Sequence, residues 1–201
     1  DATRPAPRVT ARQPEPVVQM AAAAPAQGRS AGVQMDPRFL PQTVDYSGPH
    51  KPGTIVIETA SKFLYLVQEG GQAMRYGVGV GKEGFLWHGT ETISQKREWP
   101  DWRPPAEMIK RVREQEGRIL PVHMKGGPEN PLGARALYLF QNGEDTLYRI
   151  HGACEPEYLG KAVSSGCVRL LDQDAIDLYR RARHGATVRV LPSTLPASLA
   201  V

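Results

Sequence analysis

The chain has few cysteines, few aromatic residues and no long apolar run. Of its 201 residues, two are cysteine and 7% are aromatic. No apolar run approaches the roughly 20 residues that a membrane-spanning helix needs, so the sequence predicts no transmembrane segment. The two cysteines lack a second pair and the histidines are scattered, which fits no zinc-binding spacing.

Positive charge is in slight excess and is not clustered. The formal net charge is +4, and about half of it lies in the first 42 residues, where five arginines face three acidic residues. The remainder is nearly balanced, which weighs against a nucleic-acid partner because such a partner requires a clustered basic face. A mildly basic protein can still approach an anionic polymer.

The composition changes after about residue 42. Residues 1–42 are rich in proline and alanine and show no hydrophobic period, so they cannot bury enough apolar area to offset the entropy of ordering. We interpret residues 1–42 as a disordered tether, residues 43–192 as one domain with a well-buried core, and residues 193–201 as a C-terminal tail. A removed export signal before Asp1 would explain the start of the chain, and a recombinant chain cut at this point would explain it equally well.

Alternating branched residues and glycine turns predict a mostly β domain with one or two short helices. The sequence Asn142-Gly143 predicts a tight hairpin. We expect helices over 105–115 and from 173 to about 183, the second with Asp172 as its N-cap. The loop over 121–134 has the length of loops that line functional sites. The predicted strands are 54–59, 62–68, 73–80, 89–96, 136–141, 146–151 and 187–191.

A histidine and a cysteine carry the strongest chemical signal. His151 ends an apolar strand, and Cys167 lies 16 positions downstream in a loop of small residues. A thiol and an imidazole are the minimal apparatus for covalent acyl transfer. We therefore predict Cys167 as the nucleophile and His151 as its base. A backbone carbonyl such as that of Gly152 is expected to orient the imidazole.

The predicted pair needs an activated thiol and donors for an oxyanion. An imidazole that takes the thiol proton lowers the thiol pKa by forming an ion pair. The backbone N–H groups of Gly166 and Cys167 are candidate oxyanion donors. The residues alone leave a second interpretation open, in which Cys167 is a small buried core residue and His151 a surface group.

At these residues the chain resembles the L,D-transpeptidases of the YkuD catalytic-domain family. The family signature is His-Gly at a strand end, then Ser/Thr-His-Gly-Cys followed by an apolar residue and Arg or Asn. Here it reads His151-Gly152 and Ser164-Ser165-Gly166-Cys167-Val168-Arg169. The likeness covers roughly residues 43–192 and includes TIVIETASKFLYLVQ, YGVGVGKEGFLWHGT, WPDWRPPAEMI, GGPENPLGARALYL, LDQDAIDLY and TVRVL.

Two positions depart from the family pattern. Ser165 stands where the family usually has histidine, and the base still matches His151. Cys154 stands where similar sequences usually carry asparagine. Cys154 is either an incidental small residue, which we favour, or a reversible disulfide partner of Cys167 that would switch the protein off.

The resemblance implies a β-sandwich or barrel that acts on peptidoglycan stem peptides. Cys167 would attack the carbonyl of the third residue of a tetrapeptide stem and release D-alanine. The thioester would then pass to an amine of a second stem and form a 3→3 cross-link. In some relatives the acceptor is an envelope protein or a D-amino acid.

The resemblance also implies a location, an inhibitor class and the absence of a cofactor. It implies a periplasmic or cell-wall-facing protein with a role in cell wall organisation and cell shape. Carbapenems are expected to acylate Cys167. No metal or organic cofactor is expected, because the thioester conserves the energy of the broken amide.

Other residues are weaker candidates. Ser164, Ser165 and Arg169 are expected to contact substrate, although Arg169 could equally brace the loop. Two rival functions stay open: a cysteine hydrolase of the L,D-carboxypeptidase type, and a catalytically silent wall-binding module. Core packing is favoured over a role in a groove for the aromatic residues Trp87, Trp99, Trp102 and Tyr138.

Overall fold

The computed structural model describes residues 35–82 and 87–192. It contains two α-helices, α1 (Ala106–Glu116) and α2 (Asp172–Arg181), within these residues. Two short 3-10 helices span Pro37–Phe39 and Pro156–Tyr158. The strands are β1 (Gln42–Asp45), β2 (Ile55–Glu58), β3 (Phe63–Gln68), β4 (Gln72–Gly77), β5 (Val80–Gly81), β6 (Gly89–Glu98), β7 (Arg135–Gln141), β8 (Glu144–His151), β9 (Ala162–Ser164), β10 (Val168–Arg169) and β11 (Thr187–Leu191).

Nine of these strands form one sheet in the order β1-β4-β3-β2-β11-β6-β7-β8-β10, and β5 pairs with β9. Pairing is antiparallel except for β11 with β2, β10 with β8, and β5 with β9. After β4, the backbone of Gly79 exchanges two hydrogen bonds of 2.8 and 2.9 Å with Arg169 of β10. This contact curls the sheet back on itself, as expected for the predicted β-sandwich or barrel.

The main hydrophobic core lies inside this curled sheet. It holds fully buried side chains from the central strands, among them Ile57, Ile93, Leu139 and Val188. Strand β2 is buried along its whole length, whereas β11 alternates, with Val188 and Val190 buried and Arg189 between them only partly buried. The prediction of a mostly β domain is confirmed.

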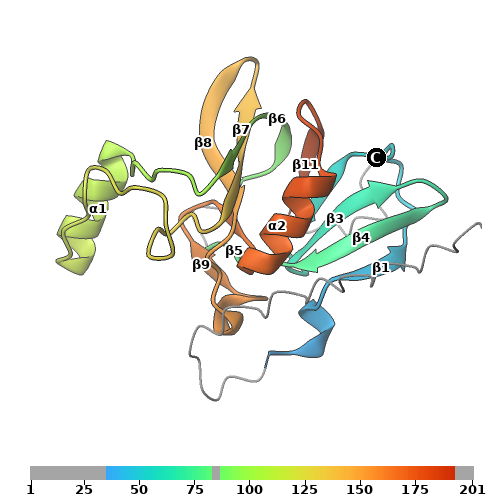
Figure 1. The fold of residues 1–201 in the computed structure, drawn as a ribbon, viewed down its shortest axis with the longest axis horizontal. Coiled ribbons are helices and arrows are strands. Elements are labelled where there is room, and N and C mark those ends of the chain that lie inside the picture. Colours follow the sequence, from blue (N-terminus) through green and yellow to red (C-terminus); the bar gives the residue numbers. More distant parts are fainter. Residues whose placement is uncertain (1–34, 83–86, 193–201) are drawn as a thin grey trace, which may run out of the picture. The chain divides into compact units, whose positions relative to one another are not determined.

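Helix α2 packs on the sheet, whereas α1 stands apart from it. In Figure 1, α2 lies beside β7, and Leu178 brings its apolar side into the core. Lys96 of β6 donates to the carbonyls of Tyr179 (2.6 Å) and Ala182 (2.7 Å) at the end of α2. A cation at this end satisfies carbonyls that lack helical partners. Helix α1 ends at Gly117, which has a left-handed φ of 64°.

Most predicted strands lie within two or three residues of their observed ends. The hairpin turn at Asn142-Gly143 has φ of 52° and 84°, as a tight turn of this type requires. The predicted strand 73–80 was wrong in one respect, because the chain leaves β4 at Gly77 and starts β5 at Val80. The short strands β1, β9 and β10 were not predicted.

The boundary of the tether at residue 42 was also wrong. The 3-10 helix Pro37–Phe39 precedes it, Phe39 is 6% exposed, and its ring packs against Phe63 at a centroid distance of 5.4 Å. The folded region therefore begins before residue 37. Residues 1–34 and the predicted tail 193–201 lie outside the described residues. No helix in the described parts of the chain has the length and apolar character to cross a membrane.

Matched isoleucines test the position of the core. Ile93 is fully buried, whereas Ile119 is 86% exposed. We expect Ile93→Ala to lower the free energy of unfolding by about 2–5 kcal/mol, because it leaves a cavity. Ile119→Ala should change it by about 0.5 kcal/mol or less. Urea unfolding with an unchanged m-value measures both, and equal losses in the two variants would contradict this core.

Candidate active site

The predicted base and nucleophile, His151 and Cys167, belong to two neighbouring strands, β8 and β10, and to the loop before β10. Strand β10 runs parallel to β8, with Arg169 opposite His151 and Val168 opposite Ile150. Side chains alternate between faces, so Ile150 and Val168 enter the core while Arg169 and His151 face the other way. Cys167 precedes β10 by one residue, so alternation along an extended chain places it on the face of Arg169 and His151. The charges of Arg149 and Arg169 act on both the thiol and the imidazole, which indicates that the two groups share these surroundings.

The loop before the cysteine is braced from within. Gly166 has a φ of 113°, a conformation that favours glycine. Its N–H donates to Ser164 Oγ (3.2 Å), and the Ser164 hydroxyl donates to the carbonyl of Cys167 (2.5 Å). Ser164 is 1% exposed. The prediction that Ser164 contacts substrate was therefore wrong, and the N–H of Gly166 is engaged within the loop rather than offered to an oxyanion.

A tryptophan holds the same loop from outside. The indole N–H of Trp87 donates to the carbonyl of Gly166 (3.2 Å), and its ring stacks on Tyr148 at a centroid distance of 4.5 Å. The expectation that Trp87 packs against the core is confirmed. Because a trans peptide points its C=O and N–H in opposite directions, this bond also sets the direction of the Cys167 N–H.

His151 is buried and has a defined tautomer. It is 3% exposed, and its Nδ1 lies 2.8 Å from the carbonyl oxygen of Gly152, the orienting contact that the sequence suggested. A carbonyl can only accept, so in the neutral ring this contact favours the tautomer with the proton on Nδ1 and the lone pair on Nε2. Burial, followed by the charge of Arg169, lowers the pKa of His151 to about 3.

Cys167 is partly buried and protonated at rest. Burial raises the pKa of its thiol, although the backbone N–H of Arg149 and the charges of Arg149 and Arg169 act in the opposite direction. This contradicts the expected ion pair, in which the thiol pKa falls. Burial disfavours the charged form of both groups, so both pKa shifts favour a neutral thiol and a neutral imidazole.

The thiol opens onto a cleft of about 930 Å³. Cys167, Leu132 and Arg149 contribute to its wall, together with residues of α1 and of the segment before it. Trp99, Trp102 and Tyr138 also line the cleft, so the expectation that they pack in the core was wrong. The charged residues lining it are Arg97, Arg103, Arg111, Arg149, Glu98, Asp101 and Glu107.

Two strained residues expose apolar side chains at this cleft. Trp99 has a φ of 42° and is 45% exposed, and Leu147 has a φ of 63° and is 55% exposed. Positive φ is uncommon for such residues and is found most often where function requires it. The N–H of Leu147 donates to Asp145 Oδ1 (2.9 Å), which holds the bulge in β8.

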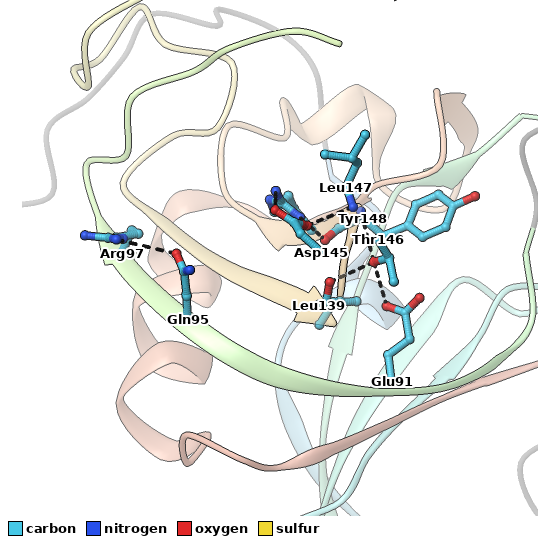
Figure 2. A network of polar contacts seen from close by, with 9 residues as sticks. Glu91, Gln95, Arg97, Leu139, Asp145, Thr146, Leu147 and Tyr148 are labelled. Atoms are coloured by element: carbon cyan, nitrogen blue, oxygen red, sulfur yellow. Dashed lines mark hydrogen bonds and ion pairs between the residues drawn. The ribbon is translucent and has the colours of Figure 1, made fainter. Parts of the chain in front are cut away.

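A polar network supports the wall formed by β7 and β8. Figure 2 shows Thr146 between the carbonyl of Leu139 (2.7 Å) and the carboxylate of Glu91 (3.2 Å). Asp145 receives two hydrogen bonds from Arg149, of 2.7 and 2.8 Å. The Arg149 guanidinium also lies 4.0 Å from the ring centroid of Tyr138. The cation nearest the thiol is thus held in one orientation.

The remaining predicted site residues lie around this centre. Ser165 lines the cleft, and its Oγ accepts from Arg111 of α1 (3.1 Å). Arg169 is partly buried, and its Nε has no hydrogen-bond partner among the described residues. Its backbone pairs with Gly79, which joins the loop to the curled edge of the sheet.

A disulfide between Cys154 and Cys167 does not fit the backbone. The N–H of Cys154 donates to the carbonyl of Leu170 (3.0 Å), and Cys167 lies three residues earlier in extended chain. Three extended residues span about 10 Å, whereas a disulfide joins Cα atoms no more than roughly 7 Å apart, so this backbone disfavours the pairing. Both thiols are free, and Cys154 packs beside Phe39 and Leu159 with a pKa raised by burial to about 11.

Asp172 is a site residue that sequence reasoning placed in a different role. It is the first residue of α2, and Leu171 is the N-cap, so the prediction of Asp172 as N-cap was wrong. Asp172 Oδ1 instead accepts from the backbone N–H groups of Ala134 (2.8 Å) and Ala153 (3.1 Å). In the sequence, only the position of Asp172 shortly after the cysteine loop pointed to a role near the candidate site. Residues 35–82 and 87–192 contain no cluster of three or more potential metal ligands.

Comparison with known proteins identifies the family. Residues 52–190 match the model of the L,D-transpeptidase catalytic domain, YkuD. The probable L,D-transpeptidase YbiS of Escherichia coli is 32% identical over 149 residues, which cover 72% of this chain and 46% of that protein. The chain therefore spans about half the length of the curated relatives it matches.

Two solved structures are similar. One is described as a probable carnitine operon oxidoreductase from Brucella melitensis. It is 51% identical, covers 78% of this chain and 96% of its own, and has a TM-score of 0.51. The other is an LD transpeptidase in complex with imipenem, 15% identical, covering 69% of this chain and 58% of its own, with a TM-score of 0.51. At 15% identity, the likeness to the LD transpeptidase structure supports a shared fold and nothing further.

The oxidoreductase description raises the question of a dinucleotide site. Residues 79–84 read Gly-Val-Gly-Lys-Glu-Gly, which has the spacing of a dinucleotide fingerprint. That fingerprint requires a turn from a parallel strand into a helix. Here Gly79 pairs with Arg169, and Val80-Gly81 form β5, so the first two glycines belong to strand pairing, while the third, Gly84, lies outside the described residues. The matched domain, the curated relatives and the fold agree instead, and the chain belongs to the L,D-transpeptidase catalytic-domain family.

Proposed function

We propose that this chain is an L,D-transpeptidase that forms 3→3 cross-links between peptidoglycan stem peptides, with Cys167 as nucleophile and His151 as base. One observation supports the proposal: Cys167 lines the cleft and directly precedes β10, which pairs in parallel with the strand that ends at His151. An envelope protein or a D-amino acid is an alternative acceptor.

The first half-reaction forms a thioester. The Nε2 lone pair of His151 takes the proton of the Cys167 thiol as the sulfur attacks the carbonyl of the third stem residue. The C–N bond to D-alanine then breaks, and His151 returns the proton to the leaving amine. Neutral resting groups suit this general-base path, because the imidazole is free to accept a proton.

The second half-reaction restores the thiol. An amine of a second stem attacks the thioester, His151 takes a proton from that amine, and the C–S bond breaks. A new amide forms, and Cys167 recovers its proton from His151. In both half-reactions the oxyanion requires a fixed donor. We assign that role to the N–H of Cys167, whose direction follows from the bond between Trp87 and Gly166.

The cleft supports a peptide substrate of mixed charge. Its volume of about 930 Å³ lies at the upper end of the range for ligand pockets, which suits an extended stem. Its lining combines arginines with carboxylates, and stem peptides carry both carboxylate and amine groups. We also propose Arg169 and Ser165 as substrate contacts, residues 43–192 together with the ordered segment that precedes them as the catalytic domain, and a periplasmic or cell-wall-facing location.

Matched cysteine variants test the nucleophile. We expect incubation with a carbapenem to add one inhibitor mass to the wild type and to Cys154→Ala, and none to Cys167→Ala, because Cys154 is buried with a high pKa. With defined tetrapeptide stems, Cys167→Ala should form no dimer. Intact-mass spectrometry and product analysis measure these results.

The same assay separates the rival functions. A dimer with release of D-alanine supports transfer, whereas a shortened stem without a dimer supports a cysteine hydrolase. Neither product and no adduct on the wild type would favour a silent wall-binding module and overturn the proposal.

The pH dependence of thiol alkylation tests the neutral resting pair. The pKa of His151 is lowered to about 3 and the pKa of the Cys167 thiol is raised, both first by burial. Lowering the pH therefore creates no thiolate. Alkylation of Cys167 by iodoacetamide should rise about tenfold per pH unit from pH 6 to above 8.5.

Peptide mapping separates Cys167 from Cys154 in this measurement. His151→Gln should leave the profile nearly unchanged, because a neutral imidazole contributes no charge to the thiol. A reactive plateau that extends down to pH 4–5 would demonstrate a thiolate–imidazolium pair and contradict the neutral state.

Trp87→Phe tests the orientation of the loop. Phenylalanine keeps the stack on Tyr148 and removes only the N–H that binds the Gly166 carbonyl. We expect kcat to fall about 2- to 12-fold with KM within about twofold, since the lost hydrogen bond is worth roughly 0.5–1.5 kcal/mol. Steady-state kinetics on defined stems measure the change. An unchanged kcat, or a rise in KM alone, would argue against this role.

A further inference from the structure

One peptide unit joins an acidic side chain to the buried histidine. The N–H of the Gly152–Ala153 peptide donates to Asp172 Oδ1 (3.1 Å). The carbonyl of the same peptide accepts from His151 Nδ1 (2.8 Å). Because a trans peptide is planar and its N–H and C=O point in opposite directions, a rotation that breaks one of these bonds also breaks the other.

The space around this peptide is filled by the carboxylate. A Cβ built on Gly152 would lie 2.0 Å from Asp172 Oδ1, so a larger residue cannot occupy this position without moving the carboxylate. Ala153 has a φ of 56°, which alanine rarely adopts. The hydrogen bond to Asp172 compensates for that conformation. The glycine of the His-Gly pair is therefore explained by its contact with Asp172.

The position of Asp172 at the start of α2 also stabilises its carboxylate. Asp172 begins α2, where the helix dipole favours a negative charge. Oδ1 accepts from Ala134 as well, at 2.8 Å, so it joins the end of the loop before β7 to the loop after β8. Both hydrogen bonds of the Asp172 side chain go to loop residues, Ala134 and Ala153. Its hydrogen bonds thus serve the loops around His151.

We propose that Asp172 is a positioning residue that fixes the tautomer and orientation of His151 through the Gly152–Ala153 peptide. The proposal deepens the proposed function and rests on it for the role of His151 as base. The N–H of Ala153, polarised by the carboxylate, makes the Gly152 carbonyl a stronger acceptor. That carbonyl keeps the proton on Nδ1 and leaves Nε2 free to accept the thiol proton.

The first measurement is the tautomer of His151 in protein carrying ¹⁵N-labelled histidine. The His151 ring signals are assigned by their loss in His151→Gln. We expect a single tautomer protonated at Nδ1 in the wild type and a mixture of both tautomers in Asp172→Ala. Asp172→Asn, whose side-chain oxygen still accepts both N–H groups, should retain the wild-type tautomer.

The second measurement is the kinetics of stem cross-linking. By analogy with outer partners of metal-binding histidines, kcat should fall about 10- to 100-fold in Asp172→Ala, with KM within about twofold. Asp172→Asn should recover to within about tenfold of the wild type. If Asp172→Ala does not fold, Asp172→Ser replaces it, because serine favours a helix start but is too short to reach Ala153.

Asp177→Ala is the matched control on the same helix. Asp177 pairs with Arg181 (2.9 Å) and accepts from Tyr76 (2.7 Å), away from the cleft. Its loss should lower thermal stability without changing the His151 tautomer or kcat. A role of Asp172 that is only structural would make the two aspartates behave alike.

The two measurements test the positioning role of Asp172 separately from the proposed transpeptidase activity. The tautomer is measured without substrate, so it decides the role of Asp172 even if the wild type makes no cross-link. A folded Asp172→Ala or Asp172→Ser protein that keeps one Nδ1-protonated tautomer overturns the proposal. A mixed tautomer in that variant, with the wild-type tautomer in Asp172→Asn and Asp177→Ala, supports it.

Discussion

The parallel pairing of β8 with β10 is the constraint on which the site depends. In one register, Ile150 and Val168 complete the core while His151 and Arg169 face the opposite side. A slip by one residue would move every side chain of the strand to the wrong face. The burial of two aliphatic side chains therefore also sets the direction of the predicted base and of Arg169, two residues after Cys167. Core packing and the chemistry of the site are coupled.

Burial has a second consequence, which concerns charge. It lowers the pKa of His151 and raises that of Cys167, so both groups are neutral at rest. Two arginines on the same face, Arg149 and Arg169, oppose the protonation of the imidazole and favour the thiolate. Charge separation in the proposed reaction thus develops only as the thiol proton moves, in surroundings where fixed donors and cations act over short distances.

Local patterns predicted the parts of the structure that are held by local forces. The turn at Asn142-Gly143 and the final strand over 187–191 were found because their residues suit one backbone conformation. Strand β1 was missed because its side chains are mostly exposed, and exposed strands carry little hydrophobic signal. Ser164 was misread as a substrate contact because its burial follows from the folding of its loop, not from its residue type.

The sequence by itself determined the chemical groups of the site: one thiol and one imidazole, each beside a glycine, in a mostly β domain. Only the tertiary structure decided which groups hold them. Asp172 meets the Ala134 N–H across 38 positions, and Trp87 meets Gly166 across 79. Contacts at such separations arise when the sheet closes and strands are brought together, and no periodicity within a segment encodes them.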